Sequence, residues 1–216
     1  MSEDSWIGID ESGKGDYFGP LVIAAVYVDP AVAEYLTQLG VKDSKAISDR
    51  RVLDLSRAIR SRCLHSIVRV GPERYNELYA QMGNLNRLLA WGHARALENV
   101  LSQIDCKRAI ADQFGDERFI LDALMKKGRH IQLVQKPRAE SDVAVAAASI
   151  LARAEFLNQL DELSRTVGVP LPKGASQVEA TARQLVEKYG SNVLYKLAKV
   201  HFRTTQRVIS SLGIES

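Results

Sequence analysis

The sequence predicts an α/β layer fold. Short apolar runs typical of buried strands alternate with longer segments of helical periodicity over the first two thirds of the chain, and the remainder is helical in pattern. Strands therefore come early and helices fill the end, an order that favours helices packed on a sheet. No repeat or low-complexity segment interrupts this order.

Each predicted helix or strand is inferred from the spacing of its apolar residues and from the residues at its ends. The first two strands, at 6–9 and 21–28, are apolar runs separated by a glycine-rich turn. Ser48 is the expected N-cap of a helix that ends at Arg62, and the helix over 85–101 is amphipathic. Further strands are predicted at 64–70, 107–111 and 130–135, and further helices at 31–38, 72–82, 117–125 and beyond 140, with a break at 168–174.

Two adjacent carboxylates, Asp10 and Glu11, follow the first apolar run and lead into Gly13-Lys14-Gly15. Like charges held together at a strand end repel unless a positive group compensates them, and a divalent metal is the simplest candidate. Turn chemistry with solvated charge is the ordinary alternative. A phosphate-binding loop that starts at Gly8 is a second alternative, but Gly15 stands where that pattern needs Ser or Thr.

Two further acids stand at comparable positions. Asp112 ends the apolar run at 107–111, and Glu140 precedes a long run of small residues that predicts a helix. A carboxylate near a helix N-terminus is stabilised by the helix dipole. Asp142, two residues further on, is a local competitor for the role of Glu140.

Five motifs together resemble the catalytic domain of ribonuclease HIII, a bacterial relative of the type 2 ribonucleases H. They are DESGKGDYFGP, ADQFG, KPRAESDVAVAAASILARA, LPKGAS and KVHFRTT, and the similarity extends from Ile7 to Arg207. The resemblance implies a ribonuclease H-like fold, with a central mixed sheet flanked by helices. It also implies an endonuclease that hydrolyses the RNA strand of RNA-DNA hybrids, prefers runs of ribonucleotides, and leaves 3′-hydroxyl and 5′-phosphate ends.

The resemblance assigns the catalytic, metal-binding carboxylates to Asp10, Glu11, Asp112 and Glu140. Glu140 after Ala139 favours ribonuclease HIII, because ribonuclease HII has Asp after Gly there. The expected cofactor is Mg²⁺ or Mn²⁺, since such ions take oxygen ligands and two of them about 4 Å apart can serve both sides of a scissile phosphate. The four His and two Cys form no zinc-ligand pattern.

Nucleic-acid contacts are expected from residues that the resemblance or the local chemistry selects. Loop residues Gly13, Lys14 and Gly15 are expected at ribose 2′-hydroxyls, the group that distinguishes RNA from DNA. Asn84 and Asn86 open a helix, so capping competes with substrate contact. Ser176 is the expected cap of the next helix, and a helix start near a lysine suits an anion. The full set of expected contacts is Gly13, Lys14, Gly15, Asn84, Asn86, Lys173, Gly174, Ser176 and Lys199.

Basic residues gather in the C-terminal quarter. Residues 165–216 contain eight Lys or Arg and three Asp or Glu, whereas the preceding 164 residues contain 21 Lys or Arg and 23 Asp or Glu. On one continuous helix, Lys196, Lys199, Arg203 and Arg207 would form a positive stripe. Such a stripe suits a phosphate backbone, and a solvated helix face is the alternative. For His201 we expect packing or a phosphate contact rather than proton transfer.

Composition bounds the class of protein. With 216 residues, 46% apolar and 25% charged, the chain is typical of a soluble globular protein, and we expect one catalytic domain over 1–216 with a basic helical part at 165–216. The start MSEDSW has no signal-peptide pattern, so we expect a cytoplasmic monomer without a membrane span or an obligatory protein partner. The catalytic motif begins at Asp10, so we expect the family's separate N-terminal substrate-binding domain to be missing.

Two other functions stay open. One is incision at single embedded ribonucleotides, as ribonuclease HII performs. The other is a catalytically silent hybrid-binding module, which is disfavoured because four acids would weaken DNA binding unless metals neutralised them.

Overall fold

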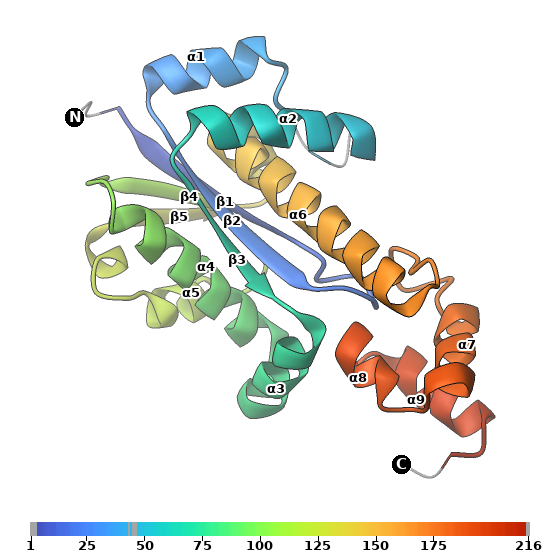
Figure 1. The fold of residues 1–216 in the computed structure, drawn as a ribbon. Coiled ribbons are helices and arrows are strands. Elements are labelled where there is room, and N and C mark those ends of the chain that lie inside the picture. Colours follow the sequence, from blue (N-terminus) through green and yellow to red (C-terminus); the bar gives the residue numbers. More distant parts are fainter. Residues whose placement is uncertain (1–3, 43, 45–46, 215–216) are drawn as a thin grey trace. The chain divides into compact units, whose positions relative to one another are not determined.

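The computed structural model describes residues 4–42, 44 and 47–214 (Figure 1). Its Cα positions separate into two compact units, which we describe one at a time. The sheet unit comprises Met1–Ser12, Val22–Val68 and Asn84–Glu155, and the helical unit comprises Gly13–Leu21, Arg69–Gly83 and Phe156–Ser216. The expectation of one catalytic domain stays a prediction.

A five-stranded mixed sheet forms the centre of the sheet unit. Its strands are β1 (Trp6–Ser12), β2 (Leu21–Val28), β3 (His65–Val70), β4 (Arg108–Asp112) and β5 (Gln132–Lys136). The spatial order is β3-β2-β1-β4-β5, with β1 antiparallel to β2 and parallel to β4, and β4 parallel to β5. This arrangement confirms the predicted α/β class with a mixed sheet.

The first strand is longer than the sequence predicts. Asp10 and Glu11 lie within β1 because β2 pairs with it as far as Ser12, and Asp10 stands opposite Ala24 in that register. Two charged residues thus occupy consecutive positions of a central strand, and their side chains point to opposite faces of the sheet.

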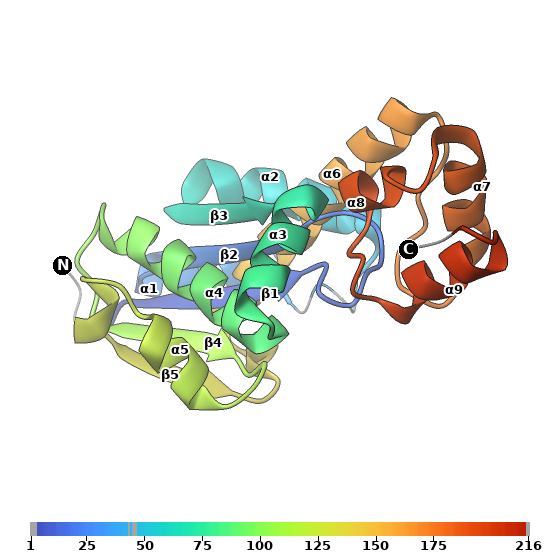
Figure 2. The same ribbon diagram turned by 90° about the horizontal axis from the view of Figure 1, so that it is seen from below.

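Helices flank the sheet. The sheet unit contains α1 (Pro30–Gln38), α2 (Asp49–Arg62), α4 (Leu85–Leu101), α5 (Glu117–Ala123), the 3-10 helices η2 (Gly128–His130) and η3 (Ala139–Ser141), and most of α6 (Val143–Val167). The predicted caps are confirmed: Ser48 accepts from Arg51 N, and Asn84 accepts from Asn86 N. Figures 1 and 2 show α2 and α6 over one face of the sheet and α4 with α5 over the other.

Two glycines let these helices approach the sheet closely. A Cβ on Gly8 would lie 2.1 Å from the carbonyl carbon of Ala144, at the start of α6. On the other face, a Cβ on Gly92 of α4 would lie 2.6 Å from Ile23 Cδ1. Because strand side chains alternate, Asp10 shares the α6 face with Gly8, whereas Glu11 lies on the α4 face.

Helix α6 is the long helix that the small-residue run predicts. By length and composition it could cross a membrane, with a mean hydropathy of 1.2 over its most apolar window, but 72% of that window is buried inside the protein. It also forms ion pairs with α2, between Glu155 and Arg60 at 2.7 Å and between Arg153 and Asp49 at 2.5 Å. These features are typical of a core helix.

The helical unit departs from the prediction at two points. It contains α3 (Pro72–Met82), the end of α6, α7 (Glu179–Tyr189), α8 (Val193–Leu197) and α9 (Arg203–Ser211). The expected cap Ser176 is wrong, because α7 begins three residues later with Val178 at its N-cap position and no side-chain cap. The expected continuous helix through Lys196 and Arg207 is also wrong.

The break between α8 and α9 has a physical cause. Buried Asn76 of α3 donates to the carbonyls of Tyr195 and Ala198 and accepts from Val200 N. In addition, Lys199 N donates to Tyr17 O at 2.8 Å. These bonds hold residues 198–202 out of the helical path, so the four basic residues do not share one helix face.

Candidate active site

Asp10 is a buried acid on the α6 face of the sheet. It is 6% exposed, and its Oδ1 accepts from Glu11 N at 2.8 Å. Burial, followed by the negative charge of Glu11, raises the pKa of Asp10 to about 8, although hydrogen bonds from Ser149 and Glu11 N oppose the rise and Asp112 adds to it. An acid in these surroundings is destabilised in its charged form unless a cation lies close to it.

Glu11 is held on the other face of β1. Its Oε2 lies 2.9 Å from His93 Nε2, and the Glu11 and His93 side chains are 3% and 0% exposed. An ionised carboxylate only accepts hydrogen bonds, so His93 is the donor. The His93 ring also packs against Phe114, with centroids 4.7 Å apart.

His93 is a site residue that the sequence analysis missed. A signal was present, because His93 follows Gly92 on the apolar face of an amphipathic helix, where a histidine needs a partner.

Asp112 ends β4 and holds the chain that carries Glu140. Its Oδ1 accepts from Ala139 N at 3.0 Å. Arg138, the residue before, has a left-handed backbone with φ of 54°, which is uncommon for a residue other than glycine. Asp112 therefore fixes the start of η3, where Glu140 lies.

Two of the other three predicted carboxylates act electrostatically on Asp10 in the structure. Ile9 stands opposite Ala111 in the parallel pairing of β1 with β4, so Asp10 and Asp112 follow at the same end of neighbouring strands. The charges of Glu11 and Asp112 both act on Asp10, whereas Glu140 is not among the groups that shift its pKa. Among the described residues, no group of three or more His, Cys, Asp or Glu side chains is placed so that it could hold a metal ion.

The donor chemistry nevertheless fits a divalent metal. The acids offer only oxygen atoms, which hard cations such as Mg²⁺ and Mn²⁺ prefer. Asp10 is buried beside other negative charge, and a cation would remove the electrostatic cost of ionising it. The fit rests on these donor atoms and on the repulsion between them.

Asp142 has a structural role. Its Oδ1 accepts from Ala144 N at 2.9 Å, from Val145 N at 3.1 Å and from Trp6 Nε1 at 3.0 Å. The carboxylate thus binds the start of α6 and ties it to β1. These three bonds favour Glu140 over Asp142 as the fourth acid.

The expected nucleic-acid residues of the sheet unit lie at the start of α4. Asn84 caps this helix through Asn86 N at 2.8 Å. The side chain of Asn86 lies against Gly115, where an added Cβ would be 2.8 Å from its Nδ2. Asn86 therefore borders the loop that follows Asp112.

In the helical unit, the loop 13–15 is tied to Lys173-Gly174. Gly174 N donates to Asp16 Oδ1 at 2.6 Å, and Tyr17 N donates to Gly174 O at 2.8 Å. These two bonds join the residues directly after the loop to the second expected substrate segment. Lys14, Lys173 and Ser176 are exposed.

The two glycines of this loop differ in what their positions require. Gly13 needs its glycine, because its φ is +91° and a Cβ would lie 2.2 Å from Pro20 O. A Cβ on Gly15 would meet no atom within 4 Å, so the backbone there is open.

The position of Lys199 differs from the one expected for a nucleic-acid contact. Its side chain is fully buried, and its Nζ donates to Asp16 O at 2.9 Å and to Gly19 O at 2.7 Å. The ammonium group cannot reach a phosphate from this position, so the expected nucleic-acid contact of Lys199 is wrong.

The other basic residues of the expected stripe lie in different surroundings. Lys196 and Arg203 are exposed, and Arg207 forms an ion pair with Glu179 at 2.6 Å. His201 stacks on Tyr79 with centroids 4.2 Å apart, in agreement with the expected packing role.

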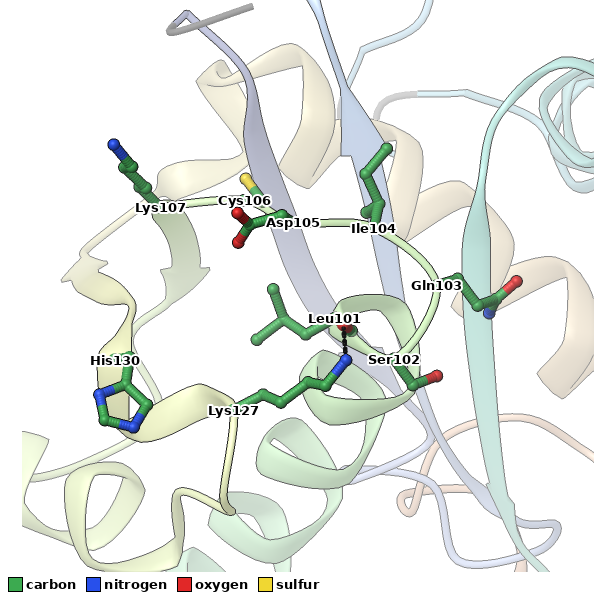
Figure 3. Close-up of a pocket in the computed structure, with 9 residues that line it drawn as sticks. All are labelled: Leu101, Ser102, Gln103, Ile104, Asp105, Cys106, Lys107, Lys127 and His130. Atoms are coloured by element: carbon green, nitrogen blue, oxygen red, sulfur yellow. Dashed lines mark hydrogen bonds between the residues drawn. The ribbon is translucent and has the colours of Figure 1, made fainter. Parts of the chain in front are cut away.

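A hollow of about 570 Å³ lies elsewhere in the sheet unit (Figure 3). Its lining runs from Leu101 to Lys107 and includes Lys127 and His130, and Lys127 Nζ donates to Leu101 O at 2.7 Å. It contains none of the four predicted acids and borders the start of β4, whereas Asp112 ends that strand. Its volume alone does not make it the reactive site.

Comparison with known proteins decides the family. A family model described as ribonuclease HII matches residues 7–205. Ribonuclease HIII of Protochlamydia amoebophila is 47% identical over 208 residues, which are 96% of this chain and 69% of that protein. Ribonuclease HIII of Chlamydia pneumoniae is 46% identical over 208 residues, 94% of this chain and 70% of that protein. This chain belongs to the ribonuclease HIII family.

Solved structures agree with this assignment. Bst-RNase HIII, crystallised in complex with Mn²⁺, is 34% identical and superposes with a TM-score of 0.90 over 98% of this chain and 71% of that one. Ribonuclease H2 of Pyrococcus horikoshii, at 22% identity and a TM-score of 0.82, shares the fold over 98% of this chain and 100% of that one. As a ribonuclease HIII family member, the chain is a type 2 ribonuclease H, an endoribonuclease of RNA-DNA hybrids, and the predicted fold and enzyme class are confirmed.

Proposed function

We propose that this ribonuclease HIII family member hydrolyses the RNA strand of RNA-DNA hybrids with two divalent metal ions, using Asp10, Glu11, Asp112 and Glu140 as ligands. The observation that carries the proposal is buried Asp10, on which the charges of Glu11 in the same strand and of Asp112 at the end of neighbouring β4 both act. Buried like charges oppose folding unless a cation compensates them.

The protein's own contribution is to hold these acids. Glu11 N and Ser149 bind the Asp10 carboxylate, His93 binds that of Glu11, and Ala139 N binds that of Asp112. When bound, two such ions would activate a water and stabilise the departing 3′ oxygen. Products with 3′-hydroxyl and 5′-phosphate ends follow from cleavage of that bond. Either Mg²⁺ or Mn²⁺ suits the ligand set, and the Mn²⁺ complex of Bst-RNase HIII supports a divalent ion of this kind.

Substrate recognition is proposed for the loop 13–15 and its neighbour Lys173-Gly174. Gly15 has open space where a side chain would stand, so a sugar can approach its backbone closely. Each 2′-hydroxyl contact contributes modestly, so several consecutive ribonucleotides should bind better than one. We therefore propose a preference for runs of ribonucleotides. Monomeric state and cytoplasmic location stay predictions.

The test is cleavage of two end-labelled duplexes in Mg²⁺ and in Mn²⁺. One duplex carries a long RNA tract opposite DNA, and the other carries one ribonucleotide in duplex DNA. We expect metal-dependent cuts within the tract and poor incision at the single ribonucleotide, and an Asp112→Asn variant should bind the hybrid without cutting it. Comparable rates on the two duplexes would favour the ribonuclease HII type, and binding without cleavage by the natural chain would make it a silent hybrid-binding module.

A further inference from the structure

Lys199 is a fully buried lysine whose side-chain nitrogen contacts backbone oxygens. Nζ donates to the carbonyls of Asp16 and Gly19 at 2.9 and 2.7 Å. The ring of Tyr75 lies 5.5 Å from Nζ, within the range of a cation-π contact. The side-chain nitrogen of Lys199 thus contacts two backbone carbonyls and the ring of Tyr75.

These two carbonyls bracket the segment directly after the loop 13–15. Between them, Tyr17 O accepts from Lys199 N at 2.8 Å, and Phe18 forms an isolated β-bridge with Ala198. Gly19 N donates to Leu197 O at 2.9 Å. The segment 16–19 is therefore bound on its backbone by the stretch 197–199.

The segment 16–19 also forms hydrogen bonds to Gly174, in the second stretch that is expected to contact substrate. Asp16 accepts from Gly174 N through its side chain while its carbonyl accepts from Lys199. Tyr17 N donates to Gly174 O, and Tyr17 OH lies 2.9 Å from Thr205 Oγ1. Asp16 is thus the residue through which Lys199 and Gly174 are joined.

A buried lysine is a costly way to stabilise a fold. Removing its ammonium group from water is unfavourable, and a well-packed apolar side chain of similar size often serves stability as well or better. What an apolar side chain cannot do is satisfy the carbonyls of Asp16 and Gly19 at once, and an unsatisfied carbonyl would turn the backbone of Asp16 or Gly19 toward water. A lysine at this position fixes a backbone conformation.

We propose that Lys199 is a positioning residue that holds the loop 13–15 and Lys173-Gly174 in their substrate-binding conformation without touching the substrate. This inference rests on the proposed function of those two loops. It replaces the phosphate contact expected from sequence, and it assigns to Lys199 an effect on hybrid affinity that is independent of counterion release.

The experiment compares three variants with the natural chain. Lys199→Met removes both hydrogen bonds and keeps the volume, Lys199→Gln keeps one amide donor group, and Lys188→Met alters an exposed lysine of α7 as the matched control. Hybrid dissociation constants are measured from about 50 to about 200 mM salt. The other measurements are kcat and KM in Mg²⁺, and amide hydrogen exchange over residues 13–19 and 173–174.

We expect Lys199→Met to weaken hybrid binding about tenfold, to raise KM more than it lowers kcat, and to speed exchange at Gly19 and Gly174. The slope of log affinity against log salt should stay unchanged, because no phosphate contact is lost. Lys199→Gln should recover part of the affinity and the protection, and Lys188→Met should alter neither.

Three results would overturn the inference. A salt slope reduced by about one would make Lys199 a phosphate ligand. If a folded Lys199→Met or Lys199→Gln variant binds hybrids as tightly as the natural chain and shows the same amide hydrogen exchange, Lys199 has no positioning role. If Lys199→Met does not fold, Lys199→Gln decides, and a Gln variant that also fails to fold would make Lys199 a stability residue and so contradict the proposal.

Failure of the proposed function is separable from failure of this inference. If the natural chain does not bind hybrids, the proposed function fails, while the exchange measurement still reports on the loops. If the natural chain binds hybrids without cutting them, the affinity measurements still test the role of Lys199.

Discussion

His93 Nε2 donates a hydrogen bond of 2.9 Å to Glu11 Oε2, from a ring that is completely buried. The other ring nitrogen, Nδ1, is buried and has no hydrogen-bond partner among the described residues. The hydrogen bonding of the ring is therefore directed at Glu11, with Phe114 packed against it. Residues that hold a metal-binding side chain in this way fix its orientation and tune its affinity.

The first prediction follows from that pair. His93→Ala should lower the affinity for Mn²⁺ by roughly 10 to 100-fold, because Glu11 loses the donor that orients it. Isothermal titration of Mn²⁺ into the chain without substrate measures this directly. The exposed histidine His130 supplies the control, since His130→Ala should bind Mn²⁺ as the natural chain does. Equal Mn²⁺ affinity in His93→Ala and the natural chain would exclude the orienting role.

A second prediction separates Glu140 from Asp142. Glu140→Gln should abolish cleavage while hybrid binding persists, because an amide is a poor ligand for Mg²⁺. Asp142→Ala should instead lower the free energy of unfolding by about 1–2 kcal/mol, since it removes the carboxylate that binds the start of α6 and Trp6. Urea denaturation and single-turnover cleavage distinguish the two. If Asp142→Ala is folded but inactive and Glu140→Gln is active, the fourth ligand is Asp142.

The third prediction uses the two glycines of the substrate loop. Gly13→Ala should destabilise the chain by at least about 1 kcal/mol, because its backbone is left-handed and Pro20 O fills the space. Gly15→Ala should leave the melting temperature unchanged and weaken hybrid binding, since its side is open in the free protein. Thermal melting and hybrid titration give both quantities. Natural hybrid affinity in Gly15→Ala would show that substrate does not approach this backbone.

Sequence alone predicts those parts of this protein that depend on neighbouring residues. The strands β1, β2 and β4 follow from apolar runs. The acids Asp10, Glu11 and Asp112 are recognisable because two of those runs end in charge, and Ser48 and Asn84 are recognisable as caps because each precedes a helical period. Such signals lie within a few positions of the residue that they identify.

The parts that the sequence analysis missed depend on contacts between distant residues. His93 and Glu11 are 82 positions apart, and no local pattern pairs them. The spacing places Lys199 on a basic stripe only if the helix is continuous, whereas Asn76, 124 positions before Val200, holds the chain out of that helix. Periodicity describes which face a residue would occupy, but tertiary hydrogen bonds decide whether the helix continues.

The fourth prediction concerns the basic residues that remain exposed. Lys196→Ala and Arg203→Ala should each lower the salt slope of hybrid binding by about one unit if each contacts a phosphate. Arg207→Ala should change the slope less, because Arg207 is paired with Glu179. Fluorescence anisotropy with two hybrids of different base sequence measures the slopes, which should not depend on sequence. Unchanged slopes in the first two variants would mean that Lys196 and Arg203 are solvated side chains without a phosphate contact.

The last prediction is the pH dependence of stability that Lys199 confers. Burial lowers the pKa of Lys199 to about 7 from an ordinary 10.5, and the negative charge of Asp16 opposes the decrease. Below a pH of about 7 the amine is protonated in both the folded and the unfolded chain, so its contribution is constant. Between pH 7 and 10.5 the unfolded chain binds more protons than the folded chain, so the free energy of unfolding rises with pH.

The other groups that face Lys199 do not reverse this sign. Burial raises the pKa of Tyr75 above its usual range, and burial together with Lys199 lowers the pKa of His201, so both stay neutral between about pH 7 and 9. Relative to Lys199→Met, the natural chain should therefore gain on the order of 1–2 kcal/mol in free energy of unfolding from about pH 7 to 9. Urea denaturation of both chains at intervals of about one pH unit across this window measures the difference. A difference that stays flat or falls would mean that the buried amine keeps its proton, and the charged form would then be the one that holds Asp16 and Gly19 throughout.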